Sequence, residues 1–134
     1  MATQLISGNG IGTWDRVIDV VAPVIADVLD GRVARCEISA PESGKQITGY
    51  LLDDGRLRLC ALGNDELSGD ERLTVQDERA VIAVGFSAST ATWGTFNWDW
   101  STPVSPELVA SGIVRTLRDI YQVEPDQLEA SAIV

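Results

Sequence analysis

The stretch KQITGYLLDDGRLRLCAL, residues 45–62, decides the fold because it predicts a β-hairpin whose register can be worked out. A three-residue loop over 53–55, with Gly55 in the left-handed conformation, pairs Leu52 with Arg56. One face of the hairpin is then apolar and consists of Ile47, Gly49, Leu51, Leu57, Leu59 and Ala61. The other face consists of Gln46, Thr48, Tyr50, Arg56, Arg58 and Cys60. A two-residue loop would mix the two faces, so the first register is favoured.

The segment before the hairpin, RVARCEISA at residues 32–40, predicts a further strand. Alternation along it places four small or apolar residues on one face: Ala34, Cys36, Ile38 and Ala40. Cys36 is therefore predicted to point toward the core, whereas Cys60 points away from it. Two thiols on opposite faces of a sheet cannot be bridged, so we expect both to be free.

The segment TWGTFNWDW, residues 92–100, holds three of the four tryptophans and no basic residue. Read as a strand, it has one face made of Phe96, Trp98 and Trp100, and another made of Trp93, Thr95, Asn97 and Asp99. Platforms that stack nucleic-acid bases lie in basic grooves, so we predict instead that the first face packs against helices. The alternative is that an aromatic face, the one with Trp93, stays exposed and meets a partner, because tryptophan is enriched in interface hot spots.

Three segments predict helices, each preceded by a threonine or serine that can cap its first turn. Residues 13–31 carry apolar side chains at three- and four-residue steps, and Pro23 predicts a kink or break. Residues 74–85 predict a second helix that ends at a glycine. The third begins after Ser105, and Gly112 inside it indicates a close contact with the sheet.

The predicted order of elements is α-β-β-β-α-(β)-β-α. Strands joined by tight turns predict an α+β fold, an antiparallel sheet with its helices on one face. The length of 134 residues suits a single domain, which we place at residues 13–128. Residues 1–12 are expected to be a flexible N-terminal arm and residues 129–134 a C-terminal tail.

Composition excludes several classes of function. The chain has 20 acidic and 10 basic residues and a net charge of −10. Neither nucleic acid nor an anionic membrane is therefore an expected partner. The sequence contains no histidine, which removes histidine-based catalysis and His-ligated metal sites. No apolar run has the length of a membrane span, and the first residues do not resemble a signal peptide, so a cytoplasmic protein is expected.

Three stretches resemble a known family: LTVQDERAVIAVGF, FNWDW and PVSPELVASGIVRTLRDIYQVEPDQL, which lie within residues 73–128. Together with the predicted order, they resemble the type III secretion chaperone-like fold and, more narrowly, the actinobacterial TY-Chap family of type III chaperone and YbjN-like domains. The resemblance implies a non-enzymatic, cytoplasmic, chaperone-like or adaptor domain. It implies no particular site residues.

The outer face of the predicted sheet is the candidate protein-binding surface, because an apolar centre inside a charged surround is typical of interfaces. We expect it to contact a protein partner or client, with a homodimer as the first possibility. Its candidate residues are Tyr50, Leu52, Trp93, Arg35, Arg56 and Arg58.

Two other functions stay open, a structural domain of a larger complex and an enzyme that uses carboxylates. Acid–base chemistry needs a pair of carboxyl groups with divergent pKa values in a pocket. The numerous candidates all fall in predicted loops or helix starts: Asp53, Asp54, Asp65, Glu66, Asp70, Glu71, Asp77 and Glu78. We therefore predict no catalytic, cofactor or metal site.

Overall fold

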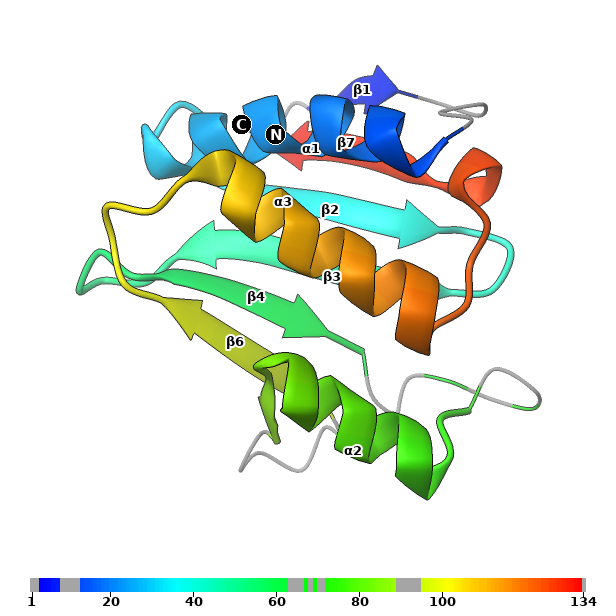
Figure 1. Cartoon of the computed structure of the whole chain (residues 1–134). Helices are drawn as coiled ribbons and strands as arrows, with labels where there is room; N and C mark the ends of the chain where they lie inside the picture. Colours follow the sequence, from blue (N-terminus) through cyan, green and yellow to red (C-terminus); the bar gives the residue numbers. More distant parts are fainter. Residues whose placement is uncertain are drawn as a thin grey trace.

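A seven-stranded antiparallel sheet with the strand order β1-β7-β2-β3-β4-β6-β5 forms the base of the molecule (Figure 1). The computed structural model describes residues 3–7, 13–62, 67, 69, 72–88 and 95–133. The strands are β1 (Thr3–Ser7), β2 (Arg35–Ala40), β3 (Lys45–Leu51), β4 (Leu57–Ala61), β5 (Ser87–Ala88), β6 (Phe96–Trp100) and β7 (Glu129–Ile133).

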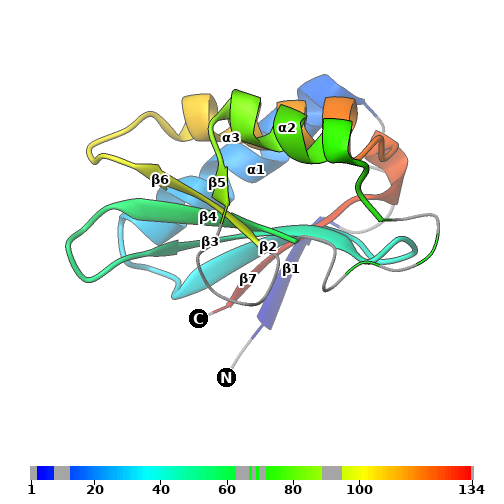
Figure 2. The same ribbon diagram turned by 90° about the horizontal axis from the view of Figure 1, so that it is seen from below.

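All three α-helices lie on one face of this sheet, and Figure 2 shows them together above it. They are α1 (Trp14–Leu29), α2 (Val75–Val84) and α3 (Pro106–Arg115). A π-helical turn over Thr116–Ile120 extends α3, and a 3₁₀ turn over Pro125–Gln127 precedes β7. The core lies between the helices and the sheet. The predicted α+β class with helices on one face is confirmed.

The predicted hairpin register is confirmed. Tyr50 lies opposite Arg58 in the β3–β4 ladder. The Leu52 amide donates to the Arg56 carbonyl across 2.8 Å, and Gly55 takes a φ of 90°. That conformation suits glycine because it has no Cβ.

The predicted helix starts are also confirmed, because Thr13, Thr74 and Ser105 each accept a backbone N–H of the first turn. A break at Pro23 does not occur. Helix α1 continues through this residue. Pro23 itself is exposed to solvent, whereas Val21 before it and Val24 after it are fully buried. Packing of both halves of α1 onto the core therefore outweighs the lost backbone hydrogen bond.

The predictions for the two ends of the chain are wrong. Residues 3–7 are not part of a flexible arm, since they pair as β1 with β7. Residues 129–133 are not a tail, since β7 lies between β1 and β2. The segment EASAI has weak strand propensity, and it forms a strand because ladders on both sides satisfy its backbone and bury Ala130 and Ala132. Residues 1–2, 8–12 and 134 lie outside the described residues.

The aromatic strand β6 faces the helices, as predicted. Phe96 is buried, and Trp98 and Trp100 pack against the core with their ring centroids 4.3 Å apart. The Phe86 ring meets Trp98 edge-on at 5.2 Å. Figure 1 shows β6 beside α2, and the short β5 pairs with the start of β6.

Two glycines make room for the Trp98 indole, and this explains the glycine inside α3. A Cβ on Gly112 would lie 3.0 Å from Trp98 Cζ3, and a Cβ on Gly85 would overlap the indole. Helix α3 thus approaches the sheet closely at Gly112, as the sequence indicated.

We predict that Gly112→Ala destabilises the protein, although the same change in a free helix interior gains about 1 kcal/mol. The added methyl group would lie 3.0 Å from Trp98 and 3.3 Å from Trp100, so these partly buried rings would have to shift. Trp98→Ala alone should cost about 3–5 kcal/mol. In a Trp98→Phe background the cost of Gly112→Ala should shrink, because the smaller ring leaves space. Denaturant melts of the single and double variants measure this, and strictly additive losses would contradict the contact.

Candidate functional site

The sheet face opposite the helices carries three of the residues predicted for binding, Arg35, Tyr50 and Arg58. The ladders align Arg35, Tyr50, Arg58 and Asp99 as one row across β2, β3, β4 and β6. Tyr50 therefore stands between two arginines. A second row beside it consists of Glu37, Thr48, Cys60 and Asn97. We call these two rows the outer face.

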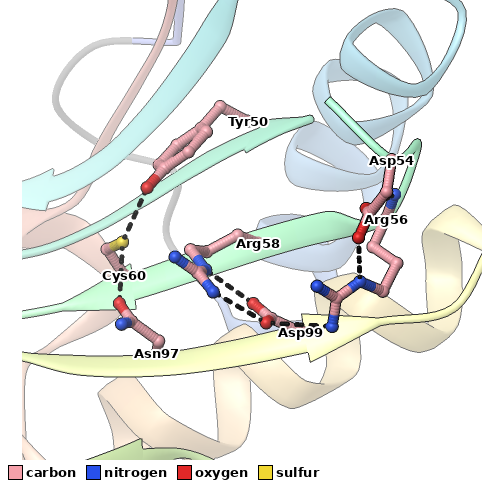
Figure 3. Close-up of polar contacts among 7 residues, drawn as sticks. All are labelled: Tyr50, Asp54, Arg56, Arg58, Cys60, Asn97 and Asp99. Atoms are coloured by element: carbon pink, nitrogen blue, oxygen red, sulfur yellow. Dashed lines mark hydrogen bonds and ion pairs between the residues drawn. The ribbon is translucent and has the colours of Figure 1, made fainter. Parts of the chain in front are cut away.

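Asp99 organises the charged side of the outer face (Figure 3). Its carboxylate accepts two hydrogen bonds from Arg58, at 2.7 and 2.8 Å, and one from Arg56 at 3.3 Å. Arg56 also bonds Asp54 at 2.9 Å. The hydrogen bonds from Arg58 lower the pKa of Asp99 despite partial burial, and the charge of Arg56 acts in the same direction. The carboxylate therefore stays ionised and fixes both guanidinium groups.

A polar chain of three side chains crosses β3, β4 and β6 next to the ion pairs (Figure 3). Cys60 Sγ donates to Asn97 Oδ1 at 3.1 Å, and the Tyr50 hydroxyl lies 3.5 Å from the same sulfur. The hydrogen bond between Tyr50 and Cys60 is the main cause that raises the pKa of Tyr50. The phenol thus stays neutral, and its half-buried ring is held at the centre of the outer face.

The structure brings most of the predicted site residues together. Tyr50 lies directly opposite Arg35 and Arg58, and Arg56 lies at the end of the hairpin with the half-buried Leu52. Trp93 lies outside the described residues. Sequence reasoning placed Asn97 and Asp99 on this face but missed that Asp99 holds two arginines and that Cys60 links Tyr50 to Asn97. Both contacts join β4 to β6, which are far apart in the sequence.

The outer face is close to neutral, although the chain carries −10. Its two arginines are matched by two acids, because Arg35 pairs with Glu37 at 3.5 Å and Arg58 pairs with Asp99. At its edge, Arg56 pairs with Asp54 and Asp99. The two cysteines behave as the register predicts. Cys36 is buried in the core, whereas Cys60 is half-buried on the outer face.

No arrangement for acid–base or metal chemistry stands out within the part of the chain that the structure describes. Among those residues, no group of three or more His, Cys, Asp or Glu could hold a metal ion. Asp53 and Asp54 are exposed, and Asp77 is used in the cap of α2. Asp65, Glu66, Asp70 and Glu71 lie outside the described residues. Among the described residues, each carboxyl group whose pKa is shifted has a lowered pKa. The cause is an arginine or, for Asp54, first a backbone hydrogen bond, and a general acid needs the opposite shift.

Comparison with known proteins extends the resemblance from part of the chain to nearly all of it. The sequence model of a family described as T3SS (YopN, CesT) and YbjN peptide-binding chaperone 3, TY-Chap3, matches residues 11–134. No curated protein and no solved structure matches the chain. Among the described residues, no helix is long and apolar enough to span a membrane.

We predict that the native protein exposes one reactive thiol and the unfolded protein two. Cys36 is fully buried, and burial raises its pKa to about 12, so it should not react before unfolding. Thiol counting with and without denaturant measures this. Cys60→Ser is the control and should remove the native signal. Native labelling that survives Cys60→Ser would contradict the placement of Cys36.

We predict that Asp99→Asn destabilises the protein by about 1–2 kcal/mol, because two fixed guanidinium groups lose their shared partner. The folded-state pKa of Asp99 is lowered, so its contribution is present above the unfolded value of about 4 and is lost as the pH falls through the folded value. The variant should therefore lose less stability on acidification than the parent.

Denaturant melts across the acidic range test this prediction. The matched control is Asp119→Asn, which removes an exposed pair with Arg118 and should change stability little. Equal acid profiles of the parent and Asp99→Asn would contradict the role of Asp99.

Proposed function

The chain belongs to the TY-Chap3 family of peptide-binding chaperones, and on that premise we propose that it is a non-enzymatic, chaperone-like or adaptor domain that contacts protein through its outer face. Its partner is a protein, and a second copy of the chain is the first candidate for this face. The two free thiols support a reducing compartment, the cytoplasm.

The observation that carries the proposal is a sheet face that none of the described helices covers. A fixed aromatic ring lies at the centre of this face. The Tyr50 hydroxyl contacts Cys60 Sγ, and the ring stands between Arg35 of β2 and Arg58 of β4. Tyrosine and arginine are the residue types enriched in interfaces and their hot spots. Because the ion pairs already fix the arginines, their ordering on binding costs less conformational entropy.

The charge of the outer face supports contact between two copies. Two chains that each carry −10 repel one another over most of their surfaces. The outer face is an exception, since its arginines and acids balance. An isologous contact would set Tyr50 and its polar surround against the same residues of the other copy.

We predict that Tyr50→Glu, alone and together with Trp93→Glu, shifts the protein from dimer to monomer. A carboxylate at the centre of the contact would lose apolar area and place like charges together. Light scattering over a wide range of concentrations gives the mass directly. The monomeric variants should still melt cooperatively, because Tyr50 does not belong to the core.

The matched control is Val75→Glu, which puts the same charge on a 63% exposed valine of α2, on the helical side. It should leave the mass unchanged. Two results together would contradict the proposed surface. The parent is monomeric at every concentration, and the Tyr50→Glu variant retains every protein that the parent binds. If the parent forms no dimer but belongs to a larger assembly that Tyr50→Glu disrupts, the chain is instead a structural domain of a complex.

A further inference from the structure

A pocket of about 610 Å³ opens on the helical side of the molecule, away from the outer face. Three segments that are distant in the sequence form it: the end of α1, the β3–β4 turn and the loop that leads into α3. The lining is mostly apolar and consists of Ala26, Leu29, Asp30, Leu51, Gly55, Thr102, Pro103, Val104 and Pro106. Nothing in the sequence alone pointed to it.

The pocket is preformed, because its walls are tied to each other and to the core. The Thr102 hydroxyl donates to the Gly55 carbonyl across 2.9 Å, which joins the loop to the hairpin turn. Leu29, Leu51 and Val104 pack against the core but remain only partly buried. Their remaining surface therefore offers apolar contact that no described segment of the chain uses. A volume of this size is in the range of small-ligand pockets and admits one or two side chains.

The charged residue of the pocket lining is acidic. Asp30 lines the pocket and is exposed, and it caps the C-terminal end of α1, whose last turn holds no basic residue. The carbonyl end of a helix favours cations. On the other side of the pocket, exposed Asp53 lies in the turn that contains Gly55.

The second helix end at the pocket does not reverse this charge. At the start of α3, Ser105 Oγ already accepts from the Leu108 amide, and Pro106 has no N–H to offer. Glu107 adds a further negative charge to this first turn. The pocket thus combines an apolar floor with an acidic rim.

We propose that this pocket holds an apolar anchor side chain of a client peptide, next to a lysine or arginine of the same peptide that meets Asp30. The proposal rests on the proposed function for the existence of a peptide client, but it uses a different surface from the outer face. A second copy of this chain is a poor occupant, because the chain and Asp30 are both negatively charged and repel one another. A cationic segment with a leucine-sized anchor is complementary in both shape and charge.

Short Gly/Ser host peptides test the ligand class. The first carries a central Lys-Leu-Leu-Lys, the second replaces both lysines with glutamate, and the third replaces both leucines with serine. NMR titration of methyl-labelled protein should show shifts at Leu29, Leu51 and Val104 with the first peptide. The other two should bind at least about tenfold more weakly, because each lacks one half of the match.

Two variants test the location. Ala26→Leu fills the pocket, and Asp30→Lys reverses the charge of its rim; each should weaken the first peptide at least about tenfold. The matched controls are Ala83→Leu, at an exposed position of α2, and Asp19→Lys, at an exposed position of α1. Both controls should bind like the parent, and melts of all four variants verify folding.

Two results would overturn the inference. No binding of any host peptide to the parent would exclude a pocket for such anchors. Binding that shifts residues of the outer face, persists in Ala26→Leu and is lost in Tyr50→Glu would move the peptide to the outer face. In that second case the proposed function would stand while the pocket would not be its site.

Discussion

The contact of Trp98 with two helices is the interaction on which the rest of the structure depends. Its indole fills the space left by Gly85 at the end of α2 and Gly112 in the middle of α3. Helix α2 needs this contact in particular, because Val81 is its only buried residue. The aromatic group of Phe86, Trp98 and Trp100 supplies the apolar surface that the helix itself lacks. The same strand, on its other side, presents Asn97 and Asp99, so the packing of one face of β6 fixes the chemistry of the opposite face.

Sequence patterns predicted those parts of the fold that are determined locally. The β3–β4 register followed from the 53–55 turn and from the alternation of apolar and polar residues on either side of it. The helix starts followed from capping side chains that lie three residues from their partners in the sequence. The two end strands could not be found in this way. Three of the five residues of β7 are alanine or serine. The strand exists through its two neighbours, which lie far away in the chain.

The candidate sites show the same limit. Alternation placed Tyr50 and Arg58 on one face, but the shared use of Asp99 by Arg56 and Arg58 depends on β4 lying beside β6. The arginines were predicted to line a contact surface, and the ion pairs that each of them makes within the chain were not predicted. The pocket needs three segments that are distant in the sequence, and its volume exists only after tertiary packing brings them together.

The place of β7 has a consequence for how the chain is made. Strand β1 is synthesised well before β7, its neighbour among the described strands of the sheet. Residues 35–61 can form their meander during synthesis, because β2, β3 and β4 are neighbours in sequence and in space. Throughout this time β2 lacks the ladder on its other side, and an open edge of this kind can pair with other chains. The sheet therefore stays incomplete until β7 has been synthesised, and until then the open edge of β2 favours association with other chains.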